Sequence, residues 1–212
     1  MTTRAWITFA LALSGCESAG GTGAGPSWQA PVDGAKGVSS GSEAERYFPL
    51  KDGTLYHYKT QALGDAPALP GALIVNVHRQ SATRGELRRP TGNQSFELTA
   101  AGIATTTKAG APAFLLKLPL EASTSWLGPH GGKSRISAAG VSVTVPAGSF
   151  SGCLTTLEER GGDAPFRILT TLCPDVGIVV LEVQSGPSVE RAELVYYGPP
   201  IDIGADGVKR VE

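Results

Sequence analysis

The sequence predicts an all-β protein whose single folded domain is an antiparallel curved sheet or open barrel. Short runs of alternating or β-branched apolar residues recur at intervals of about ten residues, which is the pattern of short strands joined by turns. Glycine (28) and proline (15) are abundant among the 212 residues, as a turn-rich fold requires. Since no window of helical length shows a 3.6-residue apolar period, we expect helices to contribute little.

The chain opens with the features of an export signal. Arg4 places a positive charge near the N-terminus, and residues 5–13 form the apolar run AWITFALAL. This order is typical of a signal peptide. The run would span about 14 Å as a helix, about half of the roughly 30 Å hydrocarbon core of a bilayer. We therefore expect residues 1–15 to be a signal peptide and not a transmembrane helix.

The apolar run ends in Leu13-Ser14-Gly15-Cys16, which resembles the lipobox of bacterial lipoproteins. The resemblance implies cleavage between Gly15 and Cys16, a diacylglycerol thioether on Cys16, and a palmitate-type acyl group on the new amino group. Two or three acyl chains anchor a protein stably, whereas one binds only marginally. Glu17 is not the aspartate that favours inner-membrane retention in enterobacterial lipoproteins, so the outer membrane is the expected address. An ordinary secretory peptide with an unrelated cysteine is the alternative.

Residues 16–43 are expected to form a flexible tether that begins with the lipidated cysteine. This stretch is rich in Gly, Ala, Ser and Pro and has almost no hydrophobic periodicity. About 26 residues at roughly 5 to 6 Å × √n reach about 25 to 30 Å, enough to hold a folded body clear of the lipid headgroups. The β domain is expected over residues 44–203, and residues 204–212 form a short C-terminal tail.

The β domain opens at about residue 46, and Asp52-Gly53 marks a turn before its first strand. Asp-Gly between apolar runs is a tight-turn signal. The connections are short, which favours antiparallel pairing. The predicted strands cover residues 54–59, 72–79, 95–99, 102–107, 113–118, 135–145, 153–160, 166–173, 177–184 and 191–197.

One hairpin can be assigned a register. If its centre is Asp163, each residue on one strand faces a chemically matched residue on the other. The opposing pairs are Arg160 with Phe166, Glu159 with Arg167, Leu157 with Leu169, Thr155 with Thr171, and Cys153 with Cys173.

This register predicts a disulfide between Cys153 and Cys173. Directly opposite residues have Cβ atoms about 4.5 to 5.5 Å apart, so a modest adjustment permits a bridge. The exported compartment is oxidising, and a loop of about twenty residues closed by the bond gives roughly 3 kcal/mol in the chain-entropy model. Because Cys16 is assigned to lipid, two cysteines remain. Two free buried thiols are the alternative.

The sequence gives no sign of nucleotide or nucleic-acid chemistry. The net charge is −1, and lysine and arginine are scattered, which argues against nucleic acid as a partner. Residues 128–134 (GPHGGKS) are one residue short of a phosphate-binding loop, contain Pro129, and lack a preceding strand and a following helix. A flexible turn between strands is the preferred interpretation.

We predict no catalytic, cofactor-binding or metal-binding residue. The three histidines, His57, His78 and His130, do not have the spacing of a zinc site. Within the expected β domain, residues 44–203, neither of the nucleophile motifs G-x-S-x-G and S-x-x-K occurs. A Ser/His/Asp arrangement assembled from distant strands stays open, because such triads are recognised by geometry and not by spacing.

Three segments resemble bacterial, myxobacterial-type envelope lipoproteins of unknown function. They are Tyr47-Phe48-Pro49-Leu50-x-x-Gly53-x-x-Tyr56-x-Tyr58, Val145-Pro146-Ala147-Gly148-Ser149-Phe150 followed by Cys153-Leu154, and Cys173-Pro174-Asp175-Val176-Gly177-Ile178-Val179. The chain departs from the family pattern by having Tyr56 where tryptophan is usual. The resemblance covers most of the mature chain, and it implies the fold and the address but no catalytic residue.

Some of these residues have a direct physical interpretation. Phe48, Tyr56 and Phe150 are expected to be core aromatics. Gly148 and Gly177 suit turns or bulges at which a side chain would collide.

Three functions follow in order of preference. The first is a non-enzymatic envelope lipoprotein that serves as a binding or structural module, attached to the bilayer through acylated Cys16 and contacting another envelope protein or a ligand. The second is a carrier that holds a lipid or other hydrophobic ligand in a half-barrel, for which an apolar cavity of about 300 to 1,000 Å³ with few charges is diagnostic. The third is a hydrolase with a dispersed site, which needs a serine or carboxylate within about 3 Å of a histidine in a cleft.

Overall fold

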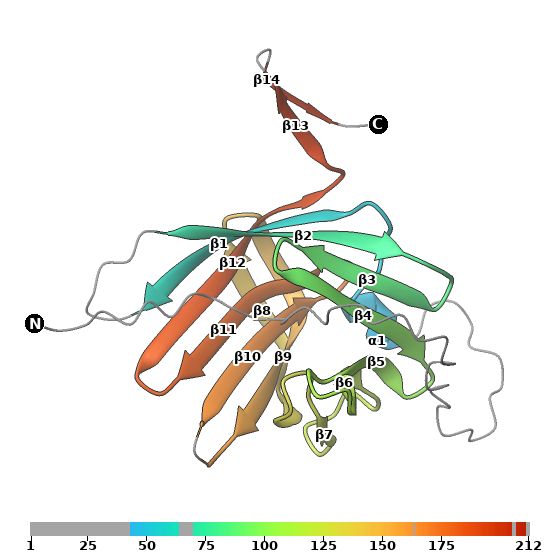
Figure 1. The fold of residues 1–212 in the computed structure, drawn as a ribbon, viewed down its shortest axis with the longest axis vertical. Helices are drawn as coiled ribbons and strands as arrows, with labels where there is room; N and C mark the ends of the chain where they lie inside the picture. The colour runs from blue at the N-terminus through green and yellow to red at the C-terminus, as the bar shows by residue number, and fades with distance from the viewer. Residues whose placement is uncertain (1–42, 64–69, 163, 205–206, 211–212) are drawn as a thin grey trace, which may run out of the picture.

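The computed structural model describes residues 43–63, 70–162, 164–204 and 207–210, with side chains described up to residue 200. Twelve strands form one strongly curved antiparallel sheet, which confirms the predicted fold class (Figure 1). These are β1 (Leu55–Leu63), β2 (Gly71–Arg79), β3 (Arg84–Arg89), β4 (Gly92–Thr99), β5 (Gly102–Thr106), β6 (Pro112–Lys117), β7 (Ser125–Leu127), β8 (Lys133–Val145), β9 (Gly148–Arg160), β10 (Phe166–Cys173), β11 (Gly177–Ser185) and β12 (Ser188–Gly198). The predicted signal peptide, the Gly15–Cys16 cleavage site and the tether up to residue 42 lie outside the described residues.

The strand order makes the sheet an almost closed barrel. The order is β6-β5-β4-β3-β2-β1-β12-β11-β10-β9-β8-β7. The strands of this sheet that come first and last in the sequence, β1 and β12, therefore pair in its middle. The two edges, β6 and β7, are consecutive in the chain, and no backbone ladder joins them among the described residues. Instead, Trp126 on β7 donates a hydrogen bond from Nε1 to the carbonyl oxygen of Phe114 on β6 at 2.9 Å. One side chain therefore bridges the seam of the barrel.

Alternation along the strands determines which side chains fill the interior. On β1, Tyr56 and Tyr58 are buried, while His57 between them is half-buried and Lys59 after them is exposed. Successive side chains of a strand point to opposite faces, so this pattern separates an inner from an outer face. The most deeply buried side chains of the core are Leu50, Ile103, Leu116, Leu154, Leu172, Leu194, Val179, Cys153 and Cys173.

A short N-terminal segment packs against the sheet. It contains α1 (Glu43–Tyr47), a single five-residue helix that sequence periodicity could not detect and that begins at the last residue of the predicted tether. After it, Phe48 packs its ring 4.9 Å from that of Phe96 on β4. Leu50 is buried against Gly85 of β3, where a Cβ would lie 3.1 Å from the Leu50 side chain. The helix α1 contacts β5 and β11, and Figure 1 shows it beside β5.

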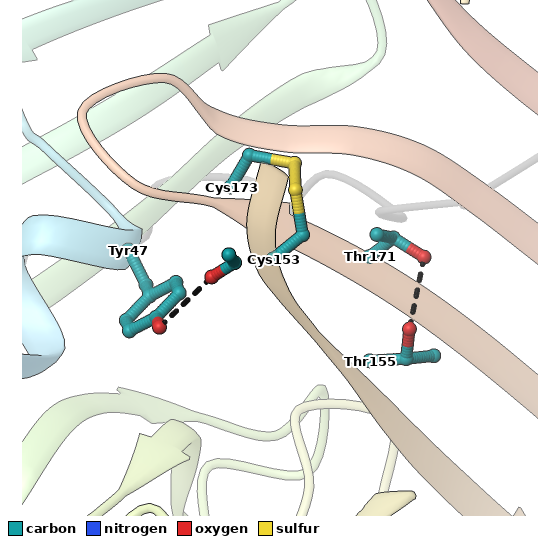
Figure 2. The surroundings of a disulfide bond; sticks show 6 residues. Tyr47, Cys153, Thr155, Thr171 and Cys173 are labelled. Carbon is teal, nitrogen blue, oxygen red and sulfur yellow. Dashed lines mark hydrogen bonds between the residues drawn. A yellow bond between two sulfur atoms is a disulfide. The ribbon is translucent and has the colours of Figure 1, made fainter. Parts of the chain in front are cut away.

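The β9–β10 hairpin has the predicted register, with Arg160 opposite Phe166 and Leu157 opposite Leu169. The predicted disulfide between Cys153 and Cys173 is present (Figure 2). Beside it, the Tyr47 hydroxyl donates a hydrogen bond to the carbonyl oxygen of Gly152 at 3.1 Å, which ties the N-terminal segment to the cross-linked hairpin.

Several elements were not predicted. β3 and β7 lie where no strand was expected, and β9 begins five residues earlier than the predicted strand at residue 153. Beyond β12, β13 (Ile201–Gly204) pairs with β14 (Gly207–Arg210) in a separate two-stranded sheet. This pair crosses the predicted start of the tail at residue 204 and projects from the main sheet (Figure 1). Among the described residues, no helix is both long and apolar enough to cross a bilayer.

Candidate ligand cavity

A cavity of about 480 Å³ lies inside the curved sheet. Its walls come from β1 to β4, β6 and β10 to β12, together with the segment after α1 and the loop between β7 and β8. Of its 28 lining residues, only Arg89 and Glu190 carry a formal charge at neutral pH. The volume falls within the range of small-molecule sites, about 300 to 1,000 Å³, and a mostly apolar lining is also typical of them.

Two tyrosines form part of the wall without offering free hydroxyl groups to the interior. The Tyr56 hydroxyl donates to the carbonyl oxygen of Val176 at 2.7 Å, and the Tyr58 hydroxyl donates to that of Ile178 at 2.9 Å. Their rings stack with centroids 6.3 Å apart. Burial raises the pKa of both tyrosines well above the ordinary value. Both therefore stay neutral and present mainly their ring carbons to the cavity.

Aliphatic and aromatic side chains supply the rest of the apolar lining. Phe48 and Phe96 meet at the α1 side of the cavity. The other large apolar lining residues are Leu73, Ile74, Val75, Val77, Leu87, Leu115, Ile178 and Leu181. Exposed lining residues from the end of β1, the start of β2 and the β3–β4 turn show where the cavity opens to solvent, and these are Ala62, Gly71, Ala72, Pro90 and Thr91.

The two charged lining residues sit on different parts of the sheet. Arg89 ends β3 and Glu190 lies near the start of β12, so β2 and β1 separate their strands. No ion pair joins them. Burial lowers the pKa of Arg89 and raises the pKa of Glu190, because the low-dielectric surroundings disfavour each charged form.

The loop between β7 and β8 closes one side of the cavity and is anchored by Glu158. One oxygen of this buried carboxylate accepts hydrogen bonds from the backbone N–H groups of His130 (2.9 Å) and Gly132 (2.8 Å), and the other lies 2.9 Å from His130 Nδ1. The expected turn between strands is present, and the buried carboxylate of Glu158 anchors it. A strand, β7, also precedes the loop, although no helix follows it.

Two glycines allow this close approach. A Cβ on Gly128 would lie 2.3 Å from both Glu158 Cδ and Ser134 Oγ. A Cβ on Gly132 would lie 2.8 Å from Glu158 Cγ. The glycine-rich composition that resembles a phosphate loop thus serves to wrap the chain around a carboxylate.

The histidines have different surroundings. His57 is on the outer face of β1, and His78 lies 3.5 Å from Asp52. His130 lines the cavity and meets the distance expected for a histidine–carboxylate pair. However, Glu158 is already engaged by the loop backbone, and no hydroxyl or thiol among the described residues hydrogen-bonds to the His130 ring. Within the same residues, no group of three or more His, Cys, Asp or Glu side chains could hold a metal.

Of the site residues predicted from the sequence, the structure brings together Cys153 and Cys173, and these do not line the cavity. Sequence reasoning missed the cavity residues Arg89 and Glu190. A signal existed for Arg89, since Gly85, Leu87 and Arg89 alternate along one short strand and so share a face.

The chain is similar to a few solved structures at low sequence identity. No protein-family model matches the sequence, and no curated protein sequence matches it. One similar solved structure is a candidate lipoprotein from Parabacteroides distasonis ATCC 8503, with 12% identity and a TM-score of 0.49 over 72% of this chain and 98% of that chain. Another is a candidate exported protein with a YmcC-like fold from Bacteroides fragilis NCTC 9343, with 9% identity, a TM-score of 0.46 and the same coverage.

Proposed function

We propose that this protein is an envelope lipoprotein that binds a hydrophobic ligand inside its barrel and acts as a carrier or binding protein, not as an enzyme. The observation that supports the proposal is the cavity of about 480 Å³, which has an apolar lining and two charged residues. A well-packed interior leaves few voids larger than a water molecule, so a hollow of this size is unusual for a purely structural module.

The packing around the cavity also supports binding. The Tyr56 and Tyr58 hydroxyls bond to backbone carbonyls, which leaves carbon surface facing inward. The loop that contributes His130 is fixed by Glu158, so that side of the cavity is formed before any ligand arrives. Preorganised walls reduce the free-energy cost of ordering on binding.

The address is part of the same proposal. The lipobox at residues 13–16 would attach acyl chains to Cys16, and the stretch up to residue 43 would connect the anchor to the barrel. A ligand that moves between the bilayer and the barrel would then cross a distance no greater than the length of the tether. The outer membrane is the proposed location.

The experiment measures binding of the apolar fluorophore N-phenyl-1-naphthylamine to the full chain carrying Cys16→Ser, so that its own acyl chains do not compete. We expect saturable fluorescence enhancement. Ala62→Trp and Leu73→Trp place indole rings in the cavity and should each weaken binding at least about tenfold, or about 1.4 kcal/mol. Ala139→Trp, at an exposed position of β8 away from the cavity, is the matched control and should leave binding unchanged.

Two results would overturn the proposal. One is the absence of saturable binding to the parent chain. The other is binding that all three tryptophan variants, folded as judged by thermal unfolding, retain equally. Either result would favour a role in contacts with another envelope protein.

A further inference from the structure

Arg89 is a partly buried cation without a partner among the described residues. Its Nε is fully buried and makes no hydrogen bond, and it is the single such side-chain nitrogen or oxygen among the described residues. No ion pair or hydrogen bond joins its guanidinium group to another described side chain or carbonyl. Buried polar groups in native proteins almost always have partners, so an orphaned donor needs an explanation.

The position of Arg89 supplies one. The residue lines the cavity at the end of β3, next to the exposed turn residues Pro90 and Thr91. Gln94, on the neighbouring strand β4, also lines the cavity. One corner of a largely apolar chamber, close to solvent, therefore has a guanidinium group, a hydroxyl and an amide in its lining.

The neighbouring Arg88 shows that the lack of a partner is specific to the arginine on the inner face of β3. Arg88 points to the outer face of the same strand, where its Nε donates to Glu86 at 2.7 Å. Glu86 is further held by the Gln80 and Asn93 amides at 3.1 and 2.9 Å. The outer arginine is thus fully provided with an acceptor by the protein, whereas the inner one is not.

We propose that Arg89 binds the anionic head group, a carboxylate or a phosphate, of a single-chain amphiphile whose hydrocarbon chain fills the cavity. This inference rests on the proposed function and specifies its ligand class. Arginine presents a planar fork of donors that pairs with carboxylate and phosphate oxygens through two parallel hydrogen bonds. The guanidinium keeps its proton at neutral pH, so the missing partner is an acceptor and, in a largely apolar chamber, one that carries negative charge.

Glu190 is the charge that could oppose this assignment. It lies three strands away in the sheet order, where it pairs with Ala62 of β1. Burial raises the pKa of its carboxyl above the ordinary value. A cationic head group placed there is the contrary outcome, and the test includes it.

The test compares four ligands that share one hydrocarbon chain: dodecanoate, dodecyl phosphate, uncharged dodecanol and dodecyltrimethylammonium. Each displaces N-phenyl-1-naphthylamine from the full chain carrying Cys16→Ser. We expect at least one of the two anions to bind about ten- to a hundredfold more tightly than dodecanol, as charge-assisted bonds to a partly buried arginine imply. The stronger of the two anions identifies the head group as a carboxylate or a phosphate.

Variants test whether Arg89 causes the preference for anionic ligands. Arg89→Met should remove the advantage of the anion while leaving dodecanol affinity within about twofold, and Arg89→Lys should restore part of it. Arg88→Met makes the same substitution on the outer face of β3 and should preserve the anion preference. The ligand-free Arg89→Met protein should be at least as stable to heat as the parent, because it loses an unpaired and partly buried charge.

The outcomes separate the two proposals. If dodecanol binds as tightly as both anions, or if dodecyltrimethylammonium binds most tightly, the assignment of Arg89 is overturned and the apolar cavity function stands. If Arg89→Met lowers the thermal stability of the ligand-free protein, Arg89 has a partner within the chain, and the assignment is again overturned. If no ligand and no fluorophore binds, the proposed function itself fails.

Discussion

Glu158 illustrates how one buried carboxylate organises a stretch of chain that lacks regular structure. Three donors from the β7–β8 loop converge on it, two of them backbone N–H groups. A buried charge is costly unless its acceptor positions are filled, so the loop and the carboxylate stabilise each other. The close approach requires positions 128 and 132 to have no side chain.

This packing predicts that Gly128→Ala destabilises the protein by about 2 to 4 kcal/mol, since the new methyl group would displace Glu158 from at least one charged hydrogen bond. Gly128 does not have a positive φ, so the effect comes from the collision and not from backbone strain. Denaturant unfolding monitored by tryptophan fluorescence measures the change. Gly161→Ala, where a Cβ would meet nothing within 4 Å, is the control and should change stability by less than about 0.5 kcal/mol. Equal effects of the two substitutions would contradict the assignment.

At the scale of elements, alternation carried most of the information. Every predicted strand overlaps an observed one, and the β9–β10 register was correct, because matched pairs such as Thr155 with Thr171 mark it in the sequence. β3 was missed because RGELRR has a single large apolar residue and its charges lie on both faces. α1 and β7 are too short for any periodicity to appear.

The disulfide belongs to this scale, because it fastens the end of one hairpin. The double substitution Cys153→Ala with Cys173→Ala should lower the free energy of unfolding by about 3 kcal/mol. Without the cross-link, the unfolded chain regains the entropy that closing a loop over a sequence separation of 20 residues removes. Thr155→Val with Thr171→Val removes the hydroxyl pair of the same hairpin and keeps the covalent link. It should cost less than about 1.5 kcal/mol. Urea unfolding of both variants, with and without reductant, distinguishes them. A reductant effect on the variant that lacks Cys153 and Cys173 would contradict the account.

At the scale of the whole molecule, the sequence predicted a curved sheet but not whether the sheet is filled or hollow. A cavity forms when the sheet curves too little for the inward side chains of opposite walls to meet. The distances between the walls arise from bulges such as the one between His57 and Tyr58 and from the loop held by Glu158. Neither can be read from periodicity, so the cavity and the position of Arg89 in its wall became visible only with the folded chain.

Attachment to a membrane is a prediction about the whole chain that rests on Cys16. Cys16→Ala should abolish acylation, because the thioether has no other sulfur in that position. Metabolic labelling with an alkyne fatty acid, followed by membrane fractionation, measures both acylation and location. We expect the parent chain to be labelled and membrane-bound and the variant to be neither. Ser14→Ala, a small residue for a small residue, serves as the control and should stay labelled. Label on the Cys16→Ala chain would disprove the lipobox assignment.

Closure of the barrel depends on the seam between β6 and β7, where the indole of Trp126 reaches the Phe114 carbonyl. Trp126→Phe removes that bond and should cost about 1 to 2 kcal/mol, part of it from lost packing of a buried ring. Because β6 carries Leu115 of the cavity wall, a looser seam should also weaken fluorophore binding. Hydrogen exchange should rise in β6 and β7 and stay unchanged in β9 and β10, since the opening is local. Leu127→Ala, at the exposed neighbouring position, should alter neither the exchange nor the binding. Exchange that rises evenly over all strands would mean that Trp126 supports the whole core and that the seam closes by other contacts.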